Sequence, residues 1–392
     1  MRSLIKWSLR AFVALVVAAV VVGFVKREEI TRLLAVNSLF SEEKIVGNFS
    51  NMEAAFLTIP VPRGDGPVSE LPRGAEMTLP ESAARWLKDR RLTSLLVLHD
   101  GQVKFEDYYL GTGENDRRIS WSIAKSYLSA LFGVLLDGGA IASLDDPVTK
   151  YAPKLTGSAY EGASIRNVLN MASGVTFDED YLDYDSDINR MGRVVALGGT
   201  LDDFAAGLKD SFTEPGAEWQ YVSIDTHVIG MVIRGATGRS VTDLLEEKII
   251  APLGLEQDGY YVTDGAGVAF VLGGLNFTTR DFARFGQMIL QNGNYGGRQV
   301  VPADWIAAST APSAPTKPDK ISYGYQWWIP IGAHEGEFLA RGVYGQYIYI
   351  DQSLGVVIAT TVADRKFREA GVHESNVAMF RAIAQSVAGE GT

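Results

Sequence analysis

The chain is 392 residues long, and 47 acidic residues against 36 basic ones give it a net charge of −11 at neutral pH. A hydrophobic share of 46% is typical of a folded protein with two or three structural lobes, and it excludes wholesale disorder. The absence of cysteine excludes disulfides, thiolate metal sites and a cysteine nucleophile. An acidic chain without basic runs is not expected to bind nucleic acid. Four histidines without an HExxH-type pair predict no metal site, and we expect no cofactor.

A long apolar segment lies next to the amino terminus. Basic residues precede an uninterrupted apolar run at 11–25, and Lys26 and Arg27 follow it. As a helix this run reaches about 22 Å, and counting from position 4 makes it long enough to cross a hydrocarbon core of roughly 30 Å. We predict that residues 1–26 are an uncleaved membrane anchor; a cleaved signal peptide and a buried core helix stay open as alternatives. Either membrane interpretation places the rest of the chain outside, in a periplasm, with an inner-membrane helix if the anchor is retained.

The segment that follows is expected to be poor in regular structure. Residues 27–80 are predicted to form an extended N-terminal segment and a connector, because five of the chain's 14 prolines lie between positions 60 and 80. A compact domain is predicted from residue 81 to residue 392.

Within this domain, strands are predicted close to both of its ends. Asp100-Gly101, between an apolar run at 95–98 and the segment 103–109, is a strong signal for a type I′ hairpin. A second strand pair is predicted at 346–351 and 356–362. We expect helices at 82–88 and 375–387, and a mainly helical lobe at about 140–290.

This order of elements predicts an α/β (α+β) architecture. One antiparallel sheet would be closed by both ends of the chain, flanked by helices, with the helical lobe inserted between its strands. A site between the two lobes is the default expectation.

The pattern Ser-x-x-Lys occurs at three places, with its serine at Ser3, Ser41 and Ser122. Only Ser122 opens an apolar helix, which is expected to end at Gly138-Gly139, so its hydroxyl would lie at the positive end of the helix dipole. Lys125, one turn later, can reach that hydroxyl. A lysine can activate a serine as a base only if burial lowers its pKa towards neutrality. The alternative is that Ser122 is a helix N-cap and Lys125 a solvated surface residue.

Two further segments carry residues suited to the same chemistry. Tyr221 and Ser223 follow Pro215-Gly216, and a phenol beside a lysine can relay a proton to a leaving group. Gly342 and Gly345 precede the C-terminal strand pair, where small residues let backbone N–H groups approach a substrate as an oxyanion hole requires. The alternative for Tyr221 is a half-buried core tyrosine, and the alternative for the two glycines is a plain turn.

Ser122-Ile-Ala-Lys125, Tyr221-Val-Ser223 and Gly342-x-x-Gly345-Gln346, in this order, resemble the motifs of the serine β-lactamase and penicillin-binding-protein superfamily. The variant is similar to the esterase-like class C branch and the 6-aminohexanoate-dimer hydrolases, over roughly residues 85–390. The resemblance implies an acyl-enzyme mechanism with Ser122 as nucleophile, Lys125 as base and Tyr221 as acid/base. It also implies an oxyanion hole made by the backbone N–H groups of Ser122 and Val343.

The resemblance also indicates substrate contacts and a substrate class. Tyr181 resembles a loop tyrosine of the nylon-oligomer hydrolases that contacts the scissile amide. Arg341 stands where β-lactamases carry Lys-Thr-Gly, which favours a carboxylic ester or a linear amide over a β-lactam. The alternatives are a D,D-peptidase or penicillin-recognising cell-wall protein, and a catalytically silent ligand-binding relative. The other residues expected to contact the small-molecule substrate are Ser223, Gly342, Tyr344, Gln346, Trp327 and Trp328.

Overall fold

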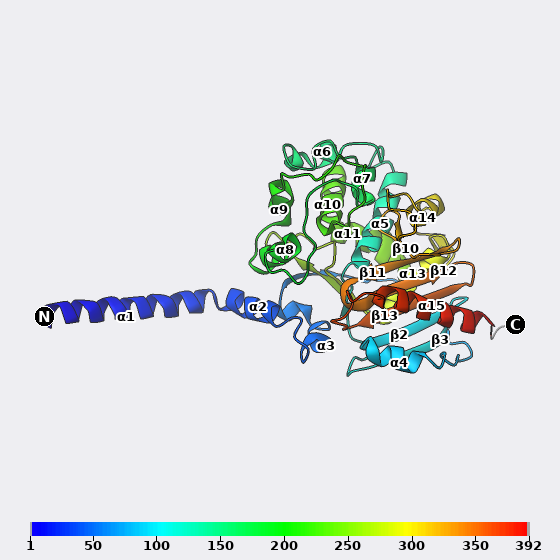
Figure 1. Cartoon of the computed structure of the whole chain (residues 1–392), viewed down its shortest axis with the longest axis horizontal. Helices are drawn as coiled ribbons and strands as arrows, with labels where there is room; N and C mark the ends of the chain where they lie inside the picture. Colours follow the sequence, from blue (N-terminus) through cyan, green and yellow to red (C-terminus); the bar gives the residue numbers. More distant parts are fainter. Residues whose placement is uncertain (1, 390–392) are drawn as a thin grey trace.

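A seven-stranded antiparallel sheet lies at the centre of the computed structural model, which describes residues 2–389 (Figure 1). Strand β2 pairs with β13, so strands from the two ends of the domain lie side by side, as the sequence predicts. In spatial order the strands are β3 (Gln102–Tyr108), β2 (Leu92–His99), β13 (Val356–Val362), β12 (Gln346–Asp351), β11 (Glu337–Gly342), β10 (Trp328–Ile329) and β9 (Ser322–Tyr323).

The turn between β2 and β3 confirms the hairpin prediction. Asp100 and Gly101 both have positive φ angles, 50° and 75°, as a type I′ turn requires. Side chains then alternate between two cores along β2. Leu96 and Leu98 face the core that contains α5 and α13, whereas Leu95 and Val97 face the one that contains α4 and α15.

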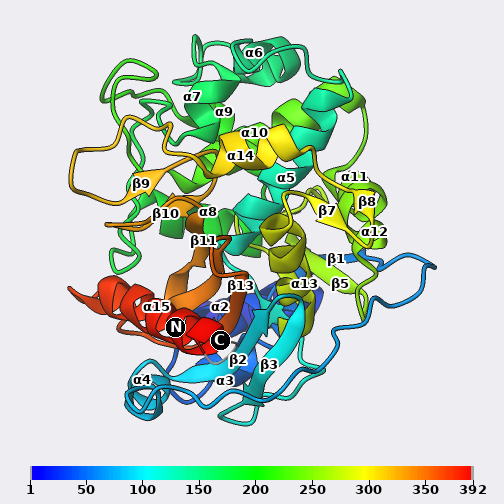
Figure 2. The same ribbon diagram turned by 90° about the vertical axis from the view of Figure 1, so that its right-hand side faces the viewer.

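Helices cover both faces of this sheet (Figure 2). On one side lie α5 (Ile123–Asp137) and α13 (Thr279–Leu290), and on the other α4 (Ala83–Asp89) and α15 (Val372–Gly389). The two outer helices meet through Trp86 and Phe380, whose rings are 5.7 Å apart in an edge-on arrangement. The predicted helices at 82–88 and 375–387 are thus present.

The insertion between β3 and β9 is mainly helical and forms the upper part of the molecule in Figure 1. It also holds strands that the sequence analysis did not predict, in a small β7-β8 pair and in a four-stranded sheet of order β1-β5-β6-β4, whose edge strand β1 comes from the N-terminal segment before β2. The strands are β1 (Leu57–Val61), β4 (Arg118–Ile119), β5 (Gly259–Thr263), β6 (Leu275–Phe277), β7 (Asn294–Tyr295) and β8 (Arg298–Gln299). The remaining helices of this part are α6 (Val148–Tyr151), α7 (Ile165–Leu169), α8 (Asp187–Ala196), α9 (Leu201–Gly207), α10 (Ser223–Thr237), α11 (Val241–Leu245), α12 (Ala251–Leu253) and α14 (Ala303–Thr310).

The amino-terminal part is more regular than predicted. Helix α1 (Arg2–Val25) projects away from the rest of the molecule, and its stretch Lys6–Val25 is long and apolar enough to cross a membrane (Figure 1). The expectation of an extended segment from residue 27 is wrong at its start, because α2 (Arg27–Asn37) and α3 (Ile45–Asn48) are helical. Helix α2 contacts α8, and this tertiary contact stabilises a short helix whose sequence alone gives a weak signal.

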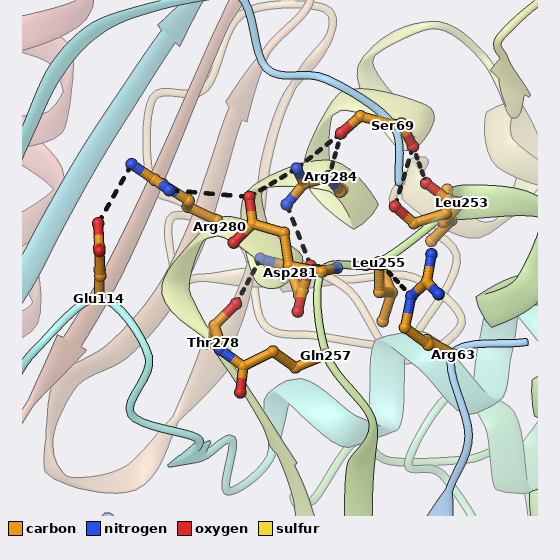
Figure 3. A network of polar contacts seen from close by, with 12 residues as sticks. Arg63, Ser69, Glu114, Leu253, Leu255, Gln257, Thr278, Arg280, Asp281 and Arg284 are labelled. Atoms are coloured by element: carbon orange, nitrogen blue, oxygen red, sulfur yellow. Dashed lines mark hydrogen bonds and ion pairs between the residues drawn. The ribbon is translucent and has the colours of Figure 1, made fainter. Parts of the chain in front are cut away.

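The proline-rich stretch that follows is extended but fixed to the body of the protein (Figure 3). The Arg63 guanidinium donates to the Leu255 carbonyl at 2.7 Å, and that of Arg284 donates to the Ser69 carbonyl at 2.7 Å. Arg284 is almost completely buried and also pairs with Asp281 at 3.1 Å. The connector is therefore part of the folded unit.

Candidate active site

A cavity of about 340 Å³ lies where α5, α10, the loop before α8 and the turn after β11 meet. Its wall brings together residues from distant parts of the chain, as the predicted site between lobes requires. Of the predicted site residues, those that line it are Ser122, Tyr181, Ser223, Val343 and Tyr344.

Ser122 occupies the N-cap position of α5, but its hydroxyl does not cap the helix. The hydroxyl is thus free for other partners, at the positive end of the helix dipole. The chain reaches Ser122 through Trp121, whose φ of 44° is unusual for a residue with a side chain. The hydroxyls of Ser126 and Ser129 fix the helix by donating to carbonyls of the 325–326 segment at 2.8 and 2.7 Å.

Lys125 is buried directly behind Ser122, with only 1% of its surface exposed. Its ammonium group donates to the Leu272 carbonyl at 3.0 Å and lies 5.4 Å from the centre of the Tyr221 ring. Burial lowers the pKa of Lys125 from 10.5 to about 7, against the opposing effect of the carboxylates of Glu179 and Asp225. A substantial share of this amine is therefore neutral near pH 7 and able to accept a proton.

Tyr221 brings a phenol to the same point. Its oxygen lies within hydrogen-bonding reach of the Ser122 and Ser223 hydroxyls, and its ring packs on Trp328 at a centroid distance of 5.0 Å. Burial, and then the Glu179 carboxylate, raise the pKa of Tyr221 far above its ordinary value. The phenol is therefore protonated at neutral pH and can act as a proton donor.

Glu179 is part of this cluster although the sequence analysis did not identify it. Its carboxylate accepts a hydrogen bond from the Ser223 backbone N–H and interacts with the Ser223 and Tyr181 hydroxyls. Burial raises the pKa of Glu179, while the charge on Lys125 opposes that shift. The sequence offers no signal for it, because Glu179 stands in an acidic loop among several carboxylates of the same kind.

The turn after β11 lies directly against the turn that carries the serine. A Cβ added at Gly342 would lie 2.6 Å from the Ser120 carbonyl oxygen, so only glycine permits this approach. Tyr344 has a positive φ of 62°, which bends the chain into the cavity wall. Gln346, predicted to contact substrate, instead exchanges two hydrogen bonds with the Val362 backbone, at 2.7 and 2.9 Å. Its buried amide thus fixes the turn to β13 and does not line the cavity.

The two adjacent tryptophans have different positions. Trp327 is 1% exposed and stacks on Phe285 at 6.2 Å, so the predicted role in an acyl pocket does not fit its place in the core. Trp328 lies beside the cluster, between the Tyr221 ring and the Arg341 guanidinium, which is 5.3 Å from the indole. Trp328 is the first residue of β10 whereas Trp327 precedes the strand, and the two neighbouring indoles pack against different parts of the protein.

Comparisons with known proteins show the family to which the chain belongs. The sequence profile of the Beta-lactamase family matches residues 83–378. The chain belongs to this family. A 6-aminohexanoate-dimer hydrolase of Paenarthrobacter ureafaciens is 31% identical over 294 residues, which cover 71% of this chain and 74% of that protein. Penicillin-binding protein 4* of Bacillus subtilis (strain 168) is 24% identical over 262 residues, 56% of this chain and 54% of that one.

Solved structures show the same fold. A Bacillus anthracis protein assigned as a 6-aminohexanoate-dimer hydrolase superposes with a TM-score of 0.78 at 24% identity, over 89% of this chain and 96% of its own. A family VIII carboxylesterase superposes with a TM-score of 0.60 at 15% identity, over 78% and 95% of the two chains. As a member of the esterase-like branch of the β-lactamase family, the chain is a serine hydrolase of amides or esters. Residues 2–82 lie outside the family match, yet part of this segment reaches the cavity.

Proposed function

We propose that the protein hydrolyses carboxylic esters or linear amides through an acyl-enzyme formed on Ser122. The observation that carries this proposal is the buried Lys125, one helical turn after the serine and against the Tyr221 ring. A solvated surface lysine would keep its proton at neutral pH, whereas this one has its pKa lowered to about 7. The three groups meet beside an apolar cavity that can hold a substrate.

The proposed reaction begins when the Ser122 oxygen attacks the substrate carbonyl carbon and its proton passes to the neutral Lys125 amine. Backbone N–H groups of Ser122 and Val343 stabilise the resulting oxyanion. Tyr221 then donates its proton to the leaving alcohol or amine and regains one from Lys125, which leaves the acyl group on the serine. Water attacks the acyl-enzyme with the same groups acting in reverse, releasing the acid and restoring the serine.

Labelling with a serine-directed fluorophosphonate tests the nucleophile. We expect the wild-type protein to label and Ser122→Ala to remain unlabelled. Ser41→Ala is the matched control, because Ser41 and Lys44 form another Ser-x-x-Lys pattern, and this variant should label like the wild type. Equal labelling of Ser122→Ala and the wild type would refute the assignment. Capture of a fluorescent penicillin at Ser122 would instead favour the penicillin-recognising alternative.

The same proposal includes a location. The proposed location is the inner membrane, with the catalytic domain in the periplasm. Helix α1 supports the anchor, because its stretch Lys6–Val25 is long and apolar enough to span a bilayer. We expect the full chain to stay in the membrane fraction after an alkaline wash, and protease added to spheroplasts to degrade the domain. A soluble chain that begins after residue 25 would identify the segment as a cleaved signal. Protection of the domain from protease would contradict the periplasmic placement.

A further inference from the structure

One wall of the cavity comes from the segment that precedes the family match. The end of α2, the turn after it and the stretch before β1 all reach the space in front of Ser122. The residues of this N-terminal wall are Val36, Asn37, Leu39, Phe40, Met52 and Phe56.

Aromatic contacts fix the N-terminal wall to the two turns beside the nucleophile. Phe40 stacks on Tyr344 with ring centres 4.8 Å apart and planes 13° apart. Phe49 packs edge-on against Trp121 at 5.5 Å and against Tyr344 at 5.4 Å. Trp121 and Tyr344 both have positive φ angles, and these contacts hold both turns in place. The wall is thus a built part of the site.

The charge of the cavity limits what it can hold. Among the described residues that line it, Arg193 alone is charged, and its guanidinium lies over the Tyr184 ring at 3.9 Å. No carboxylate is among the described residues that line this space, so an acyl chain that ends in an ammonium group, as a 6-aminohexanoyl unit does, would lose its hydration without gaining a charged partner in the lining. An uncharged hydrocarbon chain meets no such penalty.

We infer that the N-terminal wall closes an acyl subsite for a neutral aliphatic chain. The inference rests on the acyl-enzyme proposed at Ser122. A cavity of 340 Å³ equals the liquid volume of about eleven water molecules, which leaves room for a chain of about eight carbons beside the scissile group. Specificity for the acyl group therefore depends on residues upstream of the family match.

A series of nitrophenyl esters from acetate to dodecanoate tests the subsite in the full-length protein. We expect kcat/KM to rise about fourfold for each methylene buried, from about 0.8 kcal/mol per CH₂, until the cavity is full near eight carbons. Val36→Trp should lower kcat/KM for the octanoate at least tenfold more than kcat/KM for the acetate. Leu34→Trp, on the 63% exposed side chain of the same helix, is the matched control and should keep the wild-type profile.

A second comparison tests the charge argument. For the wild type, we expect kcat/KM to be at least tenfold higher for the hexanoyl ester than for the 6-aminohexanoyl ester. Asn37→Asp keeps the shape of the side chain and adds a carboxylate to the wall, so it should narrow that ratio several-fold. An unchanged ratio would contradict the proposed position of the acyl chain against α2.

The outcomes separate this inference from the proposed function. The acyl subsite alone would be overturned if hydrolysis of the acetate depends on Ser122 but kcat/KM does not rise for longer chains. It would also be overturned if Val36→Trp lowers kcat/KM equally for the acetate and the octanoate. Absence of turnover for every ester would overturn the proposed function and the subsite with it. Inactivation by alkyl phosphonates of graded length gives a readout free of turnover, and its rate should follow the same chain-length order.

Discussion

Replacement of Glu179 by glutamine is expected to shift the pH dependence of the enzyme. The base must be neutral to accept the serine proton, so kcat/KM rises with pH through the pKa of Lys125. Burial lowers that pKa to about 7, and the negative charge on Glu179 is the main effect that opposes the shift. Removing the carboxylate therefore lowers the pKa of Lys125 further, and the acid limb of the profile moves to lower pH.

The size of the effect follows from the position of Lys125. At pH 7.5 a lysine with its ordinary pKa of 10.5 is neutral in about one molecule in a thousand, whereas with a pKa of about 7 about three quarters are neutral. An opposite charge at close range shifts a pKa by roughly one to three units. The acid limb of the kcat/KM profile of Glu179→Gln should therefore lie on the order of one to three pH units below that of the wild type. Its kcat/KM should reach a plateau by pH 7.

The assay is kcat/KM for a nitrophenyl ester between pH 4.5 and 9. Glutamine can still accept the hydrogen bond from the Ser223 backbone, so the geometry of α10 is retained. Asp180→Asn is the matched control, because that carboxylate lies on the same loop but pairs with Arg368 at 3.1 Å on the surface. An acid limb of Glu179→Gln that stays in place or moves to higher pH would refute the assignment of the limb to the lysine.

Further substitutions separate chemistry from packing. Tyr221→Phe should lower kcat about 10²–10⁴-fold for an amide and less for an activated ester, whose leaving group needs no proton; equal losses for both substrates would contradict the proton-donor role. Gly342→Ala should lower kcat at least tenfold, because the added Cβ would lie 2.6 Å from the Ser120 carbonyl, and wild-type kcat would refute the close approach. Trp327→Ala should lower the free energy of unfolding by about 3–5 kcal/mol without changing the acyl-chain preference. A changed preference in the ester series would show that Trp327 contacts the acyl chain after all. Lys125→Met should be more stable than the wild type at pH 7, by on the order of a few kcal/mol in the free energy of unfolding. This difference should shrink as the pH rises towards 10.5, because between these pH values the lysine is protonated in the unfolded wild type but not in the folded one. Denaturation at pH 7 and 9.5 measures the difference, and an increase with pH would contradict the lowered pKa of Lys125.

The amino-acid sequence alone determines much of the local structure and is enough to propose a nucleophile. The hairpin at Asp100-Gly101 follows from residues that tolerate positive φ, and the helix behind Ser122 follows from its apolar periodicity. Signals of this kind lie within a few adjacent residues. The order of the three motifs therefore indicates the family, and the family match confirms that prediction.

Only the tertiary structure decides which of several similar residues belongs to the site. Glu179 is one carboxylate in an acidic loop, and its contact with Ser223 depends on how that loop packs against α10. Trp327 and Trp328 look alike in sequence, but tertiary packing places one in the core and one beside Tyr221. Phe40 reaches the cavity through packing between segments about 300 residues apart in the chain. Contacts of this range depend on the closure of the whole fold, which no local pattern encodes.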